Sequence, residues 1–281
     1  MAALASVVIP AHNEERGILR TLTRLHEGLG AEELDIVVVC NGCTDETADT
    51  VRAEFPSVRV LEIAEPSKAA AVAVGNAATE VFPRVHLDAD VHLSGSSLRA
   101  MVDAVGQDGT LAAAPRRLLA SQGCPPLVRW YYEFWEQLPQ VRRGLFGRGV
   151  FALSAEGQRR VSALPRLMSD DLAMSEAFSA GERSIVTSAE AVVVPPGTIR
   201  DLLRRRVRVA TGNAQATAMG ARGKEATTSL ATVGRLAASS PRLAVRVPVF
   251  LAVTVLARLG SRRAIRAGDF TTWLRDESSR G

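Results

Sequence analysis

The 281-residue sequence contains almost no lysine: its 34 basic residues are arginines apart from Lys68 and Lys224. The formal net charge is +4 and the sequence pI is about 9.4. The planar guanidinium of arginine suits phosphate and carboxylate partners. Most of the arginine excess follows residue 200 without any recognised nucleic-acid-binding module. We therefore expect no nucleic-acid partner.

Cysteine is also scarce, with Cys40, Cys43 and Cys124 only. An odd number of cysteines in a chain of this length argues against a disulfide framework and indicates a reducing compartment. Cys40 and Cys43 form a C-x-x-C pair, but no second pair completes a zinc site. Residues 1–10 lack the basic start and cleavage site of a secretory signal and are typical of a strand. We expect a cytoplasmic protein.

Apolar runs that stop at polar turns alternate with helical patterns through the first half of the chain. With 47% apolar residues, the chain can bury the core of one large domain. Strands alternating with helices predict an open α/β sheet whose ligands lie beyond the carboxyl ends of the strands. The predicted strands are residues 5–9, 35–40, 58–63, 84–87 and 112–115, and the predicted helices include 44–53, 68–78, 94–105 and 127–138.

The strongest chemical signal is a pair of acids, Asp88 and Asp90, which directly follows the predicted strand 84–87. A turn at this point would bring both carboxylates toward one ion. Hard oxygen ligands of this kind suit Mg²⁺ or Mn²⁺. Such a metal would neutralise the negative charge of a leaving nucleoside diphosphate. Alternatively, the two acids face solvent and cap the following helix.

Three segments at the ends of predicted strands resemble the motifs of a known family. They are residues 7–15 (VVIPAHNEE), 37–45 (VVVCNGCTD) and 86–90 (HLDAD). In this order they resemble family 2 glycosyltransferases of the GT-A fold, over about residues 5 to 210. The resemblance implies an α/β, GT-A-like fold with an open, mixed or mostly parallel sheet flanked by helices. It also implies a catalytic domain over residues 1–210 and a helical C-terminal extension over 211–281.

The resemblance implies a donor-nucleotide site along these segments. Asn41 stands where the family usually has an acid, but an amide can still bind a nucleobase. Cys43 stands where the family usually has serine, so the C-x-x-C pair needs no redox role. Lys68 is similar to a basic residue that lies near the nucleotide, although a lysine at a helix start is often a surface residue. The implied nucleotide-binding residues are Pro10, Ala11, Asn13, Glu14, Asn41, Gly42, Asp45, Lys68, Asp88, Ala89 and Asp90, with Asp88 and Asp90 as metal ligands.

Asn13 and Glu14 have an alternative role as helix caps. Further along the chain, residues 169–172 (SDDL) resemble the Glu-Asp motif of the family. This implies that Asp171 is the catalytic base, which takes a proton from the acceptor hydroxyl, with Asp170 as its acidic neighbour. The alternative is that two acids at a helix start are favoured by the helix dipole alone.

The diphosphate and the acceptor are implied to meet two more segments. Residues 203–209 (LRRRVRV) stand where processive members carry Gln-x-x-Arg-Trp. Arg205 takes the glutamine position, Arg208 matches the arginine, and Val209 replaces the tryptophan. Arginines at these positions could hold a diphosphate in bidentate fashion. The missing tryptophan argues against a polymerising enzyme.

A glycine-dense segment and an aromatic cluster also resemble acceptor-side elements. Gly149 lies in residues 144–153, where glycine permits a close backbone approach to a ligand, or simply a tight turn. Trp135 ends the aromatic run 130–135 (WYYEFW), whose rings could pack on a sugar or a lipid tail or belong to the core.

Residues 247–257 form an apolar stretch of 11 residues, shorter than the roughly 20 needed to cross a bilayer. Arginines between residues 242 and 266 flank it, so we expect either peripheral contact with an anionic membrane, on the inner face, or a buried helix.

The resemblance implies an inverting, metal-dependent and non-processive glycosyltransferase. It would move a sugar from a nucleoside-diphosphate sugar to the hydroxyl of a sugar, a lipid-linked acceptor or a small molecule. The alternatives are a nucleotidyltransferase and a catalytically inactive sugar-nucleotide-binding or membrane-scaffold protein. A nucleotidyltransferase would usually show a glycine-rich loop after the first strand, which the segment from Pro10 to Glu14 lacks.

Overall fold

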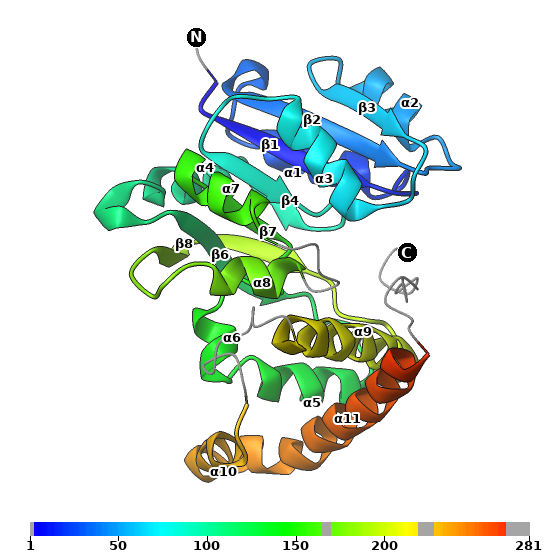
Figure 1. Ribbon diagram of the computed structural model, residues 1–281, viewed down its shortest axis with the longest axis vertical. Coiled ribbons are helices and arrows are strands. Elements are labelled where there is room, and N and C mark those ends of the chain that lie inside the picture. Colours follow the sequence, from blue (N-terminus) through cyan, green and yellow to red (C-terminus); the bar gives the residue numbers. More distant parts are fainter. Residues whose placement is uncertain (1–2, 165–169, 219–227, 268–281) are drawn as a thin grey trace.

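A computed structural model describes residues 3–164, 170–218 and 228–267 of the chain. Within these residues, eight strands form one sheet with the order β3-β2-β1-β4-β7-β6-β8-β5 (Figure 1). Helices pack around the sheet, and a group of helices lies beyond one end of it. The strands are β1 (Ala5–Ala11), β2 (Leu34–Asn41), β3 (Arg59–Ile63), β4 (Arg84–Leu87), β5 (His92–Leu93), β6 (Ala112–Leu119), β7 (Val150–Leu153) and β8 (Arg183–Val193).

The parallel half of the sheet consists of β3, β2, β1 and β4. β1 and β2 read as almost continuous apolar runs because the sheet is covered on both faces, and nearly all of their residues are buried. Since parallel strands end at the same edge, the polar segments after β1, β2 and β4 meet there. The open, mostly parallel α/β sheet expected from the sequence is confirmed.

The other half of the sheet is mixed. β7 is antiparallel to both β4 and β6, whereas β6 and β8 run parallel. The predicted strand 112–115 continues to Leu119 in β6, with a register irregularity between Pro115 and Arg116. We did not predict β8. It lacks the continuous apolar run of β1 and β2, and the first half of the strand is not buried.

The helices follow most of the predicted pattern. The predicted helix 44–53 begins three residues later, because Asp45 precedes it in the loop and bonds to its first residue. The helices are α1 (Ile18–His26), α2 (Thr47–Glu54), α3 (Lys68–Ala77), α4 (Gly95–Ala104), α5 (Pro126–Trp135), α6 (Pro139–Arg143), α7 (Ala155–Ser162), α8 (Asp170–Glu176), α9 (Ile199–Ala218), α10 (Leu230–Ser239) and α11 (Pro241–Arg266), with short 3₁₀ turns at Ala31–Glu33 and Gln107–Gly109.

Helices α5, α9, α10 and α11 form a helical layer at the end of the sheet opposite β3 (Figure 1). This layer has an apolar core of its own, in which Tyr131 and Phe134 of α5 pack on Phe250 of α11. α11 approaches α9 closely, since a Cβ added at Gly260 would lie 2.6 Å from a methyl group of Val207. The domain boundary predicted at residue 210 falls inside α9. The division into two domains stays a prediction.

The C-terminal apolar stretch is part of a longer helix than the sequence suggested. α11 has 26 residues, because its helix continues through the flanking arginines on both sides of residues 247–257. By length and composition it is the single helix in the described part of the chain that could span a membrane, which is weak evidence on its own. The helix is therefore longer than the apolar stretch within it, and peripheral membrane contact stays a prediction.

Candidate active site

The ends of β1 and β2 are held together by the segments that follow them. Asn41 Nδ2 donates to the Ala11 carbonyl at 2.7 Å, and His12 Nδ1 is hydrogen-bonded to the Asn41 carbonyl. These contacts join the first two polar segments into one rigid edge. Asn41 is thus buried at the position that the resemblance assigned to the nucleobase.

Asn13 and Asp45 also join these two segments. Asn13 exchanges hydrogen bonds with Thr44, whose backbone N–H lies 2.8 Å from Asn13 Oδ1. Asp45 accepts hydrogen bonds from the Thr47 hydroxyl at 2.5 Å and from the Glu15 backbone N–H at 3.2 Å. Burial opposes ionisation of Asp45, yet these hydrogen bonds lower its pKa. Both side chains therefore shape the edge of the sheet.

A large cavity of about 1380 Å³ lies between this edge and the helical layer. Four predicted residues, Ala11, Asn13, Gly42 and Asp45, do not line it and lie at or just after the ends of β1 and β2. The structure brings the other predicted residues with described side chains together around this single cavity. They are Pro10, Glu14, Asn41, Lys68, Asp88, Ala89, Asp90, Trp135, Gly149, Asp171, Arg205 and Arg208.

The two acids after β4 lie on a turn, as the sequence suggested. The Val91 N–H donates to the Asp88 carbonyl at 3.1 Å and closes the turn. Lys68, the first residue of α3, donates from Nζ to Asp88 Oδ1 at 2.6 Å. Asp90 is exposed beside them. The turn thus presents two carboxylates and one ammonium group to the same part of the cavity.

Asp88 and Asp90 are the two side chains of the acidic turn that could bind a metal ion. Among the described residues, no three His, Cys, Asp or Glu side chains gather into a metal-binding group. Mg²⁺ is commonly bound through one or two carboxylates and takes its other ligands from phosphates and water. A pair of acids therefore fits a divalent metal that binds together with a diphosphate, rather than a metal enclosed by protein ligands.

Gly149 lies against this acidic turn. Its φ is +67°, and its carbonyl accepts a hydrogen bond from the Asp88 N–H at 2.8 Å. A Cβ at this position would lie 2.3 Å from a methyl group of Val91 and 3.3 Å from Asp88 Oδ2. Both the backbone conformation and the lack of space thus require glycine.

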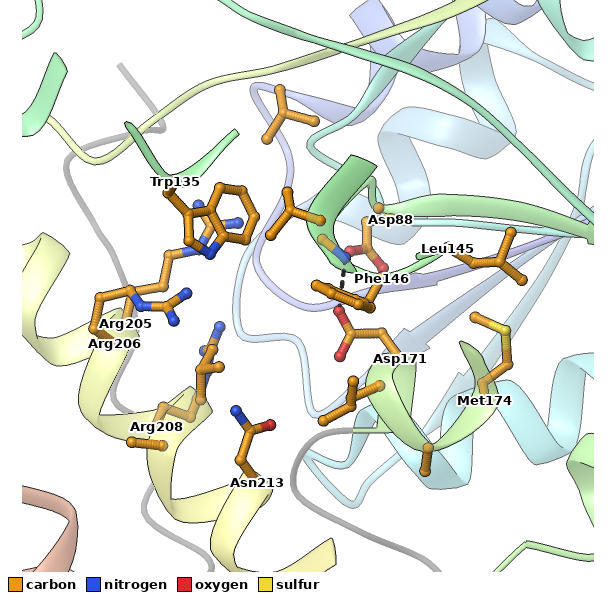
Figure 2. Close-up of a pocket in the computed structure, with 18 of the residues that line it drawn as sticks. Asp88, Trp135, Leu145, Phe146, Asp171, Met174, Arg205, Arg206, Arg208 and Asn213 are labelled. Carbon is orange, nitrogen blue, oxygen red and sulfur yellow. Dashed lines mark hydrogen bonds between the residues drawn. The ribbon is translucent and has the colours of Figure 1, made fainter. Parts of the chain in front are cut away.

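Asp171 enters the cavity from the first turn of α8. Its Oδ2 accepts a hydrogen bond from the Gly147 N–H at 2.9 Å, and Figure 2 shows the carboxylate on the same side of the cavity as Asp88. The Asp170 backbone starts α8, but its side chain, like all of Ser169, lies outside the described residues. The structure therefore gives a position for one of the two predicted acids.

Arginines of α9 form the opposite wall. Arg205, Arg206 and Arg208 all line the cavity, and Figure 2 shows them projecting from α9 on the side facing Asp171. The Arg206 guanidinium lies 5.6 Å from the ring centres of Tyr131 and Trp135. Positive charge therefore faces the acidic end of the cavity.

The predicted aromatic cluster is mainly core. Tyr131, Tyr132 and Phe134 are almost fully buried in the helical layer. Trp135 is 9% exposed and lines the cavity beneath the guanidinium of Arg117, 4.4 Å from its ring. Tyr131 and Trp135 both line the cavity beside a guanidinium, and Trp135 has the shorter contact.

Arg117 and Asn213 are among the cavity residues that were not predicted from the sequence. Arg117 of β6 donates to the Gly147 carbonyl at 2.9 Å and pairs with Glu136, while its burial lowers its pKa. Asn213 of α9 has a buried Oδ1 with no hydrogen-bond partner among the described residues. A single arginine in a strand carries no sequence signal, but Asn213 could have been found from its spacing of two helical turns after Arg205.

The family model of glycosyl transferase family 2 matches residues 6–150. This range includes the polar ends of β1, β2 and β4 and the acidic turn. The chain belongs to glycosyltransferase family 2. It is therefore an enzyme that transfers a sugar. Asp171 and the α9 arginines lie beyond the matched range, and comparison with curated proteins gives no match.

Solved structures of glycosyltransferases share the GT-A fold of this chain. The mannosyltransferase PcManGT from Pyrobaculum calidifontis, in complex with GDP-Man and Mn²⁺, is 18% identical and superposes with a TM-score of 0.62 over 95% of this chain and 76% of that one. Glucosyl-3-phosphoglycerate synthase from Mycobacterium tuberculosis, with Mn²⁺, UDP-glucose and phosphoglyceric acid, is 19% identical with a TM-score of 0.56. That match covers 78% of this chain and 81% of the synthase.

Proposed function

We propose that this glycosyltransferase transfers one sugar from a nucleoside-diphosphate sugar to an acceptor hydroxyl, with inversion and with a divalent metal. The observation that carries the proposal is the meeting of Lys68, Asp88, Asp90 and Asp171 around one cavity. The two structural neighbours hold GDP-Man or UDP-glucose together with Mn²⁺, which supports a donor and a metal of these classes.

At the sheet edge, Asp88 and Asp90 would hold Mg²⁺ or Mn²⁺, which when bound supplies positive charge to the diphosphate. Lys68 adds a cation beside Asp88. Arg205 and Arg208 face this end from α9 and offer bidentate contacts to phosphate oxygens. Together these side chains stabilise the negative charge that builds on the departing diphosphate.

Asp171 is the proposed base. In a single displacement, the acceptor oxygen forms a bond to the anomeric carbon while the bond from that carbon to the diphosphate oxygen breaks. The acceptor proton passes to the Asp171 carboxylate, and the electron pair of the broken bond leaves with the nucleoside diphosphate. The hydrogen bond from the Gly147 N–H holds the carboxylate in position for this role.

We also propose single transfer rather than polymerisation, and peripheral membrane contact through residues 242–266. Val209 lines the cavity where processive relatives carry tryptophan, which supports single transfer. α11 combines arginines with exposed Leu256 and Leu259, a composition typical of helices that lie on anionic membranes. The nucleotide-binding loops are expected to remain in water.

The test uses purified protein with UDP-glucose and GDP-mannose, each with and without Mn²⁺. We expect one donor to be consumed in the presence of an acceptor, with an inverted anomeric configuration in the product by NMR. Asp171→Asn keeps an oxygen that can accept from Gly147 but removes the base, so kcat should fall by about 10²- to 10⁴-fold. Donor affinity should change less than twofold. Unchanged turnover would reject Asp171 as the base, and retained configuration would reject inversion.

A further inference from the structure

The cavity is larger than a sugar nucleotide requires. Ligand pockets usually enclose about 300 to 1,000 Å³, whereas this one holds about 1380 Å³ and extends from the acidic turn to α10 and α11. Its far wall is apolar and includes Val233 of α10 together with Phe250 and Leu251 of α11. The donor site proposed above leaves this part of the cavity without a ligand.

The apolar wall continues to the surface of the protein. Three exposed apolar side chains line the cavity: Leu230 is 80% exposed, Val255 is 53% exposed and Ile265 is 36% exposed. Exposed apolar side chains gathered along one cavity are typical of a ligand-binding groove. An apolar chain that enters past Val255 would cover these side chains and reach the wall formed by Phe250.

The charged side chains of α10 and α11 are all arginines, because residues 228–267 contain no aspartate, glutamate, lysine or histidine. Arg258 and Arg262 line the cavity mouth, and among the described residues neither forms an ion pair. Unpaired arginines beside an apolar surface are suited to a ligand that carries both an anionic group and an apolar chain. The segment has seven arginines, of which Arg246 pairs with Glu133 of α5: Arg235, Arg242, Arg246, Arg258, Arg262, Arg263 and Arg266.

We propose that the acceptor is an anionic amphiphile: its hydroxyl reaches Asp171, its anionic group lies near Arg258 and Arg262, and its apolar chain leaves the cavity past Val255. This inference rests on the proposed function, since it assigns the acceptor class of the same site. It differs from membrane contact, which uses the outer face of α11 and needs no ligand inside the cavity.

The test measures binding of n-decyl phosphate, below its micellar concentration, by isothermal titration calorimetry. Methyl phosphate has the same anionic group without the chain, and n-decyl glucoside has the chain without the charge. We expect decyl phosphate to bind at least about 100-fold more tightly than methyl phosphate, because several methylene groups leave water. It should also bind at least about tenfold more tightly than decyl glucoside, because charged groups form the stronger hydrogen bonds.

α11 offers a matched pair of variants. Val255 lines the cavity and Leu256 does not, yet the two side chains are 53% and 52% exposed. Val255→Glu should weaken binding of decyl phosphate by at least about tenfold through loss of apolar contact and repulsion of the anion. Leu256→Glu should change it less than twofold. Arg258→Gln should weaken decyl phosphate but not decyl glucoside.

The proposal is overturned if decyl phosphate does not bind, if methyl phosphate or decyl glucoside binds equally well, or if Val255→Glu and Leu256→Glu have equal effects. Equal effects would mean adsorption to the outer face of α11. Titration of UDP and GDP with Mn²⁺ on the same samples separates this failure from failure of the proposed function. Nucleotide binding without amphiphile binding overturns the acceptor assignment alone, whereas loss of both rejects the function as well.

Discussion

The two walls of the cavity are built in different ways. At the sheet edge, polar side chains are bonded to one another: Asn41 to Ala11, Asn13 to Thr44 and Lys68 to Asp88. At the helical wall, Arg258 and Arg262 have no acidic partner within the described residues, and apolar side chains reach solvent. The comparison indicates that folding alone positions the sheet edge, which is the proposed donor wall, whereas the helical wall, the proposed acceptor wall, presents arginines and apolar side chains that a ligand would contact.

The largest effect is expected where the donor wall is tightest. Gly149→Ala forces a side chain into positive φ and against Val91, so we expect a loss of about 3 kcal/mol in the free energy of unfolding. Gly123 has a φ of +77° but nothing within 4 Å of an added Cβ, so Gly123→Ala should cost about 1 kcal/mol. Urea unfolding measures both variants. Equal losses would show that close packing on the acidic turn contributes nothing.

An intermediate effect is expected at the helical wall. Arg208→Gln removes a charge that faces the proposed diphosphate site, and we expect nucleoside-diphosphate binding to weaken by about tenfold or more. Arg204 lies on the same helix but pairs with Asp201 and does not line the cavity. Arg204→Gln should therefore change the Kd less than twofold. If both variants weaken binding equally, the helix acts through its overall charge and not through placed arginines.

The smallest effect concerns the buried end of β2. Burial, together with neighbouring Cys43, raises the pKa of the Cys40 thiol from 9.0 to about 12. Because the unfolded thiol loses its proton first, its contribution to stability is full below pH 9 and is lost as pH rises toward 12. Urea unfolding at pH 8 and pH 10 should show a larger loss for the wild type than for Cys40→Ala. Cys124→Ala serves as the partly exposed control, and equal losses in all three proteins would contradict the assignment.

Much of the donor wall could be predicted because its signals are local. The strand 84–87 and the turn with Asp88 and Asp90 are adjacent in sequence, and both lie where expected. Asn13 and Asp45 bond to neighbouring loop residues and lie outside the cavity lining, so their roles in nucleotide binding stay predictions. Local sequence identifies such residues but does not say which way they face.

The sequence by itself determined the alternating strands and helices and the polar segments that end them, because apolar periodicity and turn residues act over a few neighbouring positions. Tertiary structure alone decided that Arg117 stacks on Trp135, that Asp171 accepts a hydrogen bond from the Gly147 N–H, and that α11 lines the cavity. These contacts join residues far apart in the chain. Their geometry depends on how the helical layer packs against the sheet, and no local pattern encodes that packing.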